Sequence, residues 1–291
     1  MVKQISLILY KIIFYIDKFL YFLVKRSIII WFKDFLHKDS YKIIEISKLK
    51  VNFFIPNSLV NWRIETFYSK EPETLEWIDN FNKDQKFTFW DIGSNIGLYS
   101  IYNAIKNNNS KTIAFEPSTS NLRVLSRNIS LNNLQNKIQI MPLALTNHDN
   151  KFLTMNERSF IEGGALNSFG ETYNFEGKQF NAEMKYQTLG TSINYIVEKN
   201  ILEIPDYIKI DVDGIEHLIL KGGDRVLRNK KLKSMLIEIN ENFLEQYQDI
   251  LNIMKDSGFE IKDKKNNSDL FESDEKNSFS KVYNYIFERA S

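Results

Sequence analysis

The sequence predicts an α/β protein built on a parallel, doubly wound sheet. The first observation is an alternation of strand and helix patterns from Lys86 onward, which is typical of parallel strands joined by crossover helices. The second is a glycine-containing turn, residues 93–97, directly after the first of these strands. The third is composition: 43% of the 291 residues are apolar and 26% are charged, which supports a full core and excludes global disorder.

Charge and residue usage narrow the chemistry that the chain can perform. Its 38 Lys and Arg residues nearly balance 37 Asp and Glu residues, so the net charge of +1 gives no reason to expect a nucleic-acid partner. The chain has no cysteine and three scattered histidines, which excludes disulfide scaffolds, thiolate catalysis and Cys- or His-rich metal sites and is compatible with a reducing compartment. Its chemistry must therefore use carboxylates, hydroxyls, amides, the backbone or a bound cofactor.

Residues 1–40 predict a basic, amphipathic helical extension. Lys11, Lys18 and Lys25 recur every seven residues, so on a helix they form one polar stripe against an aliphatic and aromatic remainder. No apolar run approaches the ~20 residues of a membrane span, and no cleavage site of a signal peptide follows. Three interpretations stay open: peripheral contact with an anionic membrane from the cytoplasmic side, packing on the domain or on a second subunit of a homodimer, and a true anchor.

Residues 41–85 predict a lead-in to the main domain, which is expected to cover residues 86–291. Residues 41–59 alternate in patches and favour short strands. An amphipathic helix is expected to begin near Glu71, because Pro72 suits a first helical turn and the neighbouring acids suit its dipole.

The main domain is expected to alternate strands and helices, followed by a closing hairpin. The expected strands cover 87–91, 112–116, 137–142, 207–211 and 234–239, with helices at 98–105, around 122–129, from 216 and at 243–254. A turn at 263–277 is expected between two final strands, the last at 281–287. The irregular stretch 146–205 predicts either a mobile loop that selects the substrate or a plain β-hairpin insertion.

The glycine turn is the strongest local signal of a ligand site. Gly93 and Gly97 would let the backbone approach a ligand closely, and Glu116 lies 19 residues beyond, at the end of the next strand, where it can accept hydrogen bonds from ribose hydroxyls. The spacing lacks the dinucleotide pattern Gly-x-Gly-x-x-Gly. A carboxylate at Asp91 suits a sulfonium or ammonium group better than a phosphate. A tight turn without any ligand is the alternative.

A second acidic cluster follows the strand at 207–211. Asp211, Asp213 and Glu216 fall within six positions, and mutual repulsion would raise a pKa, as a general base requires. The same carboxylates could hold a hard cation. Glu216 also suits a helix N-terminus, His217 could be a packing residue, and Glu238 ends the next strand at the same sheet edge.

These motifs together resemble a known family. Residues 91–100, 115–118 and 208–216, followed by 220–223, resemble the FkbM-type methyltransferases, and the resemblance runs from about Glu71 to the C-terminus. It implies a Rossmann-like class I methyltransferase fold with a seven-stranded, mostly parallel sheet and an antiparallel last strand. It also implies S-adenosylmethionine-dependent O-methylation (EC 2.1.1.-) of a hydroxyl on a sugar, a glycan or a similar small molecule.

The resemblance assigns roles to particular residues. The residues implied to bind S-adenosylmethionine are Asp91, Gly93, Ser94, Asn95, Gly97, Glu116, Pro117, Ala144 and Asp211. Asp211 would lie beside the transferred methyl group. The chain departs from the family at Asp213, where many members have Glu, and at Gly190, where Asp is common.

The expected reaction is in-line methyl transfer with a carboxylate as general base. Asp211 is the preferred base, and the rival residues are Asp213, Glu216, His217 and Glu238. A divalent cation on Asp211 and Glu238 could acidify a vicinal diol. The alternatives are a nicotinamide-dependent oxidoreductase, against which the glycine spacing argues, and a non-catalytic cofactor-binding or scaffold protein.

Overall fold

The centre of the molecule is a seven-stranded sheet, as seen in a computed structural model that describes residues 1–179, 181–266 and 279–290. Its strand order is β12-β13-β11-β10-β3-β4-β5. The strands are β3 (Phe87–Ile92), β4 (Ser110–Phe115), β5 (Ile138–Met141), β10 (Tyr207–Ile210), β11 (Ser234–Asn240), β12 (Phe259–Lys265) and β13 (Val282–Arg289). Only β13 runs antiparallel to its neighbours β11 and β12. The predicted sheet, with its antiparallel last strand, is confirmed.

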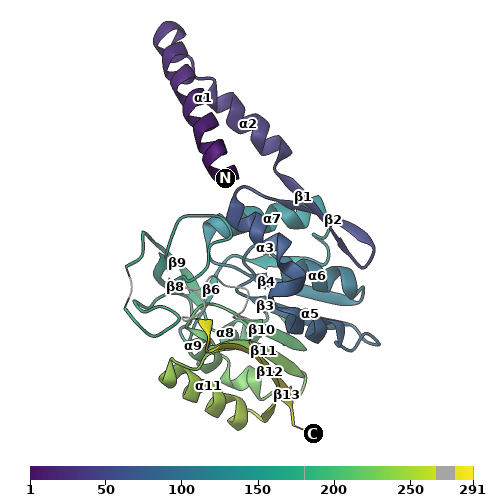
Figure 1. The fold of residues 1–291 in the computed structure, drawn as a ribbon. Helices are drawn as coiled ribbons and strands as arrows, with labels where there is room; N and C mark the ends of the chain where they lie inside the picture. Colours follow the sequence, from purple (N-terminus) through teal and green to yellow (C-terminus); the bar gives the residue numbers. More distant parts are fainter. Residues whose placement is uncertain (180, 267–278, 291) are drawn as a thin grey trace.

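Helices cover both faces of this sheet (Figure 1). One face packs against α3 (Ser58–Glu65), α4 (Phe67–Lys70), α5 (Pro72–Asp79), α6 (Leu98–Lys106) and α7 (Thr119–Leu131). The other packs against α8 (Ile193–Glu198), α9 (Glu216–Lys221), α10 (Asp224–Leu227) and α11 (Leu244–Asp256). The predicted doubly wound arrangement is therefore confirmed.

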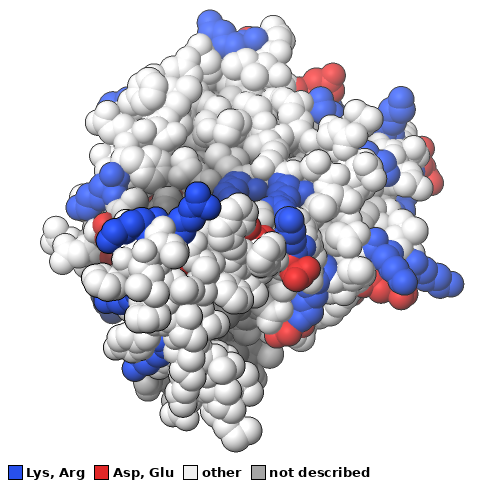
Figure 2. Space-filling model, turned by 90° about the horizontal axis from the view of Figure 1, so that it is seen from above, with Lys and Arg blue, Asp and Glu red and all other residues white. Residues whose placement is uncertain are grey.

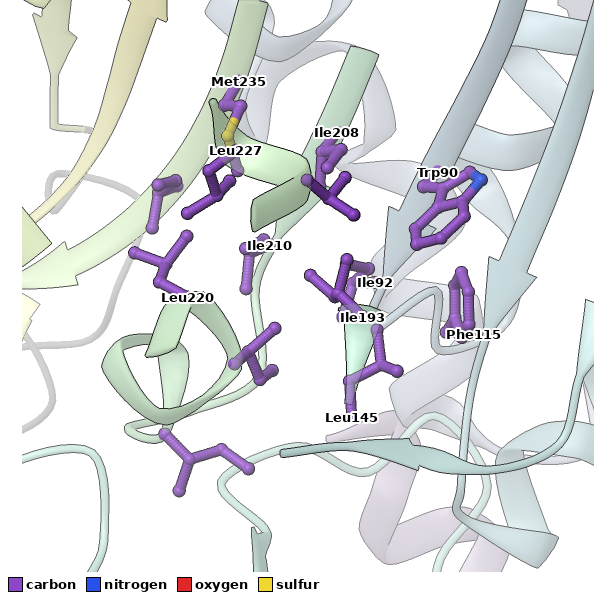
Figure 3. Packing of buried hydrophobic residues seen from close by; sticks show 14 of the residues in the cluster. Trp90, Ile92, Phe115, Leu145, Ile193, Ile208, Ile210, Leu220, Leu227 and Met235 are labelled. Carbon is purple, nitrogen blue, oxygen red and sulfur yellow. The ribbon is translucent and has the colours of Figure 1, made fainter. Parts of the chain in front are cut away.

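Two buried apolar clusters, one on each face, hold the layers together. Successive strand residues point to opposite faces, so Phe89 joins the cluster under α3–α7 while Trp90 joins the cluster under α8–α11. Figure 3 shows the second cluster, in which Ile208 and Ile210 of β10 lie beside Trp90 and Leu220. The apolar strands of the sequence thus contribute side chains to the core on both faces of the sheet.

The N-terminal extension is divided into α1 (Val2–Val24) and α2 (Ile29–Asp39), which project from one end of the molecule (Figure 1). Neither helix contains a buried residue, so the apolar face of this segment does not pack on its own domain, although His37 of α2 contacts Phe54.

Two antiparallel strands follow the helical extension: β1 (Tyr41–Ile46) and β2 (Leu49–Phe54). The expectation of strands up to Leu59 is wrong at its end, because Asn57 caps α3 by accepting a hydrogen bond from the Val60 amide.

The stretch predicted to be irregular contains a second, four-stranded sheet. Its order is β6-β9-β7-β8, formed by β6 (Ala144–Leu145), β7 (Lys151–Glu157), β8 (Ser168–Phe169) and β9 (Met184–Thr191). β7 and β9 pair antiparallel over their whole length, which agrees with the hairpin alternative. The predicted turn at 263–277 begins within β12, and most of it lies outside the described residues.

Candidate active site

The glycine turn after β3 adopts a backbone that only glycine fits. Gly93 has a φ of +83°, and a Cβ on it would stand 1.8 Å from the carbonyl oxygen of Asp211. Gly97 has a φ of +88°, and its Cβ would lie 2.5 Å from Cδ1 of Leu125. Asn95 between them is also left-handed, with a φ of 50°. The turn is therefore pressed against the end of β10, where the acidic cluster begins.

Asp91 lies directly beneath this turn and is fully buried. Its Oδ2 accepts a hydrogen bond of 2.6 Å from the Ser100 hydroxyl, while Oδ1 has no partner among the residues that the structure describes. Burial raises the pKa of Asp91, although Lys209 opposes that shift. A buried carboxylate oxygen without a donor is suited to a ligand that brings positive charge or N–H groups.

Glu116 stands at the end of β4, next to the glycine turn. Its carboxylate accepts hydrogen bonds from the amides of Asn95 (2.7 Å) and Ser118 (2.9 Å). Burial nevertheless raises the pKa of Glu116 to about 8. The carboxylate can therefore change its charge near neutral pH.

Two cavities meet at the carboxyl ends of β3 and β10. The larger, of about 390 Å³, reaches toward α3–α5, and the smaller, of about 70 Å³, reaches toward the ends of β4 and β6. Gly93, Asn95 and Asp211 line both of them. The position between the cavities is where a group bound in one could react with a group bound in the other.

Most residues predicted to bind a cofactor lie in these cavities. Six of the predicted residues line the smaller cavity: Gly93, Asn95, Glu116, Pro117, Ala144 and Asp211. Ser94 lines the larger one. Asp91 and Gly97 line neither and instead support the turn from below and behind. The predicted set therefore forms one site, although its members contribute in different ways.

The loop between β7 and β8 lies across the meeting point of the cavities. The carbonyl oxygen of Gly164 accepts hydrogen bonds from the side-chain amides of Asn95 (2.8 Å) and Asn121 (3.2 Å). The Leu166 amide donates to Asp213 at 2.6 Å. The sequence predicts either a substrate-selecting loop or a β-hairpin insertion here, and neither alternative includes this attachment to the glycine turn.

A buried lysine lies at the base of the larger cavity. Lys209 is 1% exposed, and its Nζ lies 2.7 Å from Oδ2 of Asp211. Its neighbours in β10, Ile208 and Ile210, point into the opposite cluster, so Lys209 points toward α4–α6. Burial alone would lower the pKa of Lys209, but the carboxylates of Asp211, Glu71 and Asp91 raise it above its ordinary value. Lys209 therefore keeps its positive charge.

Glu71 completes this buried network from the start of α5. It forms an ion pair with Lys70 and accepts a hydrogen bond of 2.7 Å from the Tyr99 hydroxyl. Although burial acts in the opposite direction, Lys70 and Lys209 hold the pKa of Glu71 at about 2. Sequence reasoning interpreted Glu71 only as a helix-start acid and missed Lys209. The available signal was a lysine inside an otherwise apolar strand.

Three of the predicted catalytic acids come together. Asp211, Asp213 and Glu238 each offer an oxygen within 4.8 Å of the others, and Asp211 and Glu238 line the larger cavity. Burial, reinforced by the charge of Asp211, raises the pKa of Asp213 to about 6 and that of Glu238 well above its ordinary value. Burial and the neighbouring carboxylates therefore favour the neutral form of Glu238 more than they would for an exposed glutamate. The group has the donors for a divalent cation, and a metal on Asp211 and Glu238 stays a prediction.

The other two predicted catalytic residues line neither cavity. Glu216 is buried and accepts hydrogen bonds from the amides of Val212 (3.1 Å) and Gly214 and from Nε2 of Gln246 (2.6 Å). It therefore fixes the turn that follows β10. The His217 ring lies against Phe243 in an edge-on contact, and burial lowers its pKa to about 4. Their placement supports the packing and helix-start alternatives for these two residues.

Gly190, where the family resemblance leads us to expect Asp, has a steric role here. A Cβ at this position would lie 2.3 Å from the ring of Phe169. Phe169 lines the smaller cavity. The glycine therefore makes room for an aromatic wall of that cavity.

Comparison with known proteins gives a consistent result. Residues 91–261, more than half of the chain, match the methyltransferase FkbM domain. Methyltransferase sdnD of Sordaria araneosa is 26% identical over 216 residues, covering 67% of this chain and 82% of that protein. The range matched by the family model spans the glycine turn, Glu116, Lys209 and the three clustered acids.

Two solved structures illustrate the structural likeness. Methyltransferase FkbM from Methylobacillus flagellatus gives a TM-score of 0.45 at 14% identity over 80% of this chain, which spans 55% of that chain. M. capricolum TrmK, in complex with S-adenosyl-homocysteine, gives a TM-score of 0.42 at 14% identity over 75% of this chain and 68% of its own.

Proposed function

The chain belongs to the FkbM methyltransferase family, and from this premise we propose that it transfers a methyl group from S-adenosylmethionine to a hydroxyl of a sugar or glycan. The observation that carries the proposal is the meeting of a small and a large cavity at Gly93, Asn95 and Asp211. A cofactor that extends from the smaller cavity across the glycine turn can thus meet an acceptor held in the larger cavity. Membership of a methyltransferase family argues against the alternative of a nicotinamide-dependent oxidoreductase.

The residues around the smaller cavity fit the proposed cofactor. Gly93 lets the turn lie against the Asp211 carbonyl, so the backbone of residues 93–95 borders the cavities. The Asp91 carboxyl lies beneath the turn and outside both cavities, so it would act on a positively charged methionine moiety through the turn and not by direct contact. Glu116 offers a carboxylate to the ribose hydroxyls, and Ala144 and Phe169 offer apolar surface to the adenine. When bound, the cofactor supplies a methyl group made electrophilic by its sulfonium.

The acceptor is proposed to bind in the larger cavity. Trp62, Phe67 and Tyr99 give this cavity aromatic faces on which a sugar ring can stack, while Arg63 and Lys70 offer hydrogen-bond donors. The combination of stacking surface and charged donors favours a polar, ring-shaped acceptor over a purely apolar one.

The chain's own catalytic contribution is the handling of the hydroxyl proton. Asp211 is the acid that lines both cavities, so it is the proposed proton acceptor. Lys209 holds one of its oxygens by the 2.7 Å ion pair and thereby orients the carboxylate. Glu238 lines the larger cavity beside Asp211, where its carboxyl group can hydrogen-bond the acceptor.

The remaining predictions about partners and location form part of this proposal. Because S-adenosylmethionine is a cytoplasmic metabolite, the proposed reaction takes place in the cytoplasm. A nucleic-acid acceptor is not proposed, since the net charge is +1. Among the described residues, no helix is long and apolar enough to cross a membrane.

Methyl transfer from labelled S-adenosylmethionine to a panel of free sugars, nucleotide sugars and envelope glycans tests the proposal. The expected result is label in an O-methyl sugar together with an equal amount of S-adenosylhomocysteine. Asp211→Asn should retain cofactor binding and lose transfer by at least about a hundredfold. Cofactor binding without transfer to any hydroxyl would favour the non-catalytic alternative, and transfer to amines alone would contradict the proposed acceptor.

A further inference from the structure

The N-terminal hairpin, formed by α1 and α2 (residues 2–39), carries an apolar surface that the domain does not cover. Neither helix has a buried residue. One face of α1 presents six large apolar side chains that are 48% to 63% exposed: Ile5, Ile8, Ile12, Ile16, Phe19 and Leu23. Trp31 and Phe35 of α2 are exposed as well. A contiguous apolar surface of this extent marks an interaction site.

The hairpin has a defined shape because Asp17 joins its two helices. The carboxylate of this α1 residue accepts hydrogen bonds from the Ser27 hydroxyl (2.9 Å) and from the amides of Ile28 (2.6 Å) and Ile29 (3.2 Å). These amides begin α2, so one helix caps the other across the turn. Apolar exposure of α1 is thus a property of a folded unit.

A polar contact fixes the hairpin to the domain. Nε2 of His37, near the end of α2, lies 3.0 Å from a guanidinium nitrogen of Arg123 and 2.9 Å from one of Arg127, both on α7. The His37 ring also packs edge-on against Phe54 of β2. The attachment leaves the apolar face of α1 free.

Positive charge accompanies the apolar face. Residues 1–40 contain seven basic and three acidic groups, and Asp17 is already engaged in the helix cap. Lys3, Lys11, Lys18 and Lys25 are exposed and, by their spacing, follow one side of α1 next to the apolar face. Figure 2, which views this end of the molecule, shows Lys and Arg side chains in a band with few acids between them.

We propose that the N-terminal hairpin docks on the surface of an anionic lipid bilayer. Its exposed aliphatic residues would enter the boundary between headgroups and acyl chains, with the lysines extended toward the lipid phosphates. The exposed Trp31 suits the same interfacial depth. Helix α1 spans no bilayer, and a second hairpin is a poor partner because it would bring seven further basic groups against these. This inference does not depend on the proposed reaction.

Flotation of the full chain with lipid vesicles tests the docking. Binding is expected to vesicles of phosphatidylcholine with 30% phosphatidylglycerol, to weaken in 0.5 M NaCl, and to be weak on pure phosphatidylcholine. The Lys11→Gln/Lys18→Gln variant should lower the partition coefficient about thirtyfold. Ile12→Glu/Phe19→Glu should abolish binding, because each charge would enter the acyl boundary.

A matched control replaces an exposed apolar residue of the domain. Phe152 is 65% exposed on β7, and Phe152→Glu should leave vesicle binding unchanged. Because the hairpin contains no buried side chain, the hairpin variants should keep the thermal transition of the domain, which circular dichroism checks.

Two outcomes would overturn the proposal. One is equal binding of the full chain and the Ile12→Glu/Phe19→Glu variant to anionic vesicles. The other is absence from the vesicle fraction together with a dimer, measured by light scattering, that the same substitutions convert to monomer. The second outcome would assign the surface to another copy of this chain.

Discussion

The two sides of the active site are held in place by different forces. The turn side, residues 91–97 with Glu116, relies on backbone geometry, since Gly93 and Gly97 occupy a left-handed conformation against neighbouring atoms. The charged side relies on ionic groups, of which Glu71 and Lys209 are buried and Lys70, Asp211 and Glu238 are half-buried. From this difference we expect added atoms to be most damaging on the turn side, and loss of a charge partner to be most damaging on the charged side.

The largest effect is expected from adding one methyl group to the turn side. Gly93→Ala would place a Cβ 1.8 Å from the Asp211 carbonyl oxygen, so the free energy of unfolding should fall by more than about 4 kcal/mol. Gly258→Ala is the control, because Gly258 has the same left-handed backbone (φ +81°) but its nearest atom would be 3.6 Å away. It should cost about 1 kcal/mol. Urea denaturation measures both, and equal losses would show that conformation, not contact, governs the turn.

The next effect is expected on the charged side. Lys209→Met would leave Asp211 and Glu71 buried without their shared cation, so stability should fall by about 3 kcal/mol. Lys231→Met is the control: its pair with Glu203 spans 3.7 Å between exposed side chains and should contribute less than about 0.5 kcal/mol. If Lys209→Met left the free energy of unfolding unchanged, packing and not ion pairing would stabilise the charged side.

A third prediction separates charge from geometry on the turn side. The pKa of Glu116 is raised to about 8, and only its ionised form can accept hydrogen bonds with both oxygens. S-adenosylmethionine affinity should therefore increase as pH rises from 6 to 9. Glu116→Gln should bind about twentyfold more weakly at pH 9 and nearly normally at pH 6. Isothermal titration calorimetry measures the affinity of both proteins against pH. A difference in affinity that stays constant from pH 6 to 9 would contradict the role assigned to the Glu116 charge.

The smallest effect is expected at Glu216, which belongs to neither side. Burial raises its pKa to about 7 in the folded chain, so its contribution to stability is complete below about pH 4.5 and is lost as pH rises toward 7. Glu216→Gln should reduce the pH dependence of the melting temperature in this window. Methyl transfer should stay within about threefold of the unsubstituted enzyme. If Glu216→Gln lowered methyl transfer as much as is expected for Asp211→Asn, Glu216 would have to be considered a catalytic residue.

The turn side could be predicted from sequence because its determinants are local. Glycine spacing, an acid at the strand end and the following helix fall within residues 91–116, and all form the expected strand–turn–helix unit. The sheet could be predicted for the same reason, since each strand carries its own apolar pattern. The second sheet escaped prediction because its strands are short or half exposed and pair across long loops.

The charged side could not be predicted because its partners are distant in the chain. Glu71 and Lys209 interact across more than one hundred residues, and each alone suggests a helix-start acid or a surface lysine. The same limit applies to the attachment of Gly164 to Asn95 and Asn121, which depends on the path of a loop. The sequence motifs and the family resemblance point to the acids near residue 211 as a group. Only the folded structure shows that Asp211 lines the cavities and that Glu216 does not.

The contact between Gly190 and Phe169 couples two positions that are 21 residues apart. A Cβ at position 190 would stand 2.3 Å from the aromatic ring, so any larger residue there requires the ring to move or position 169 to carry a smaller side chain. Because Phe169 lines the smaller cavity, a substitution at position 190 would change the shape of that cavity without touching its contents.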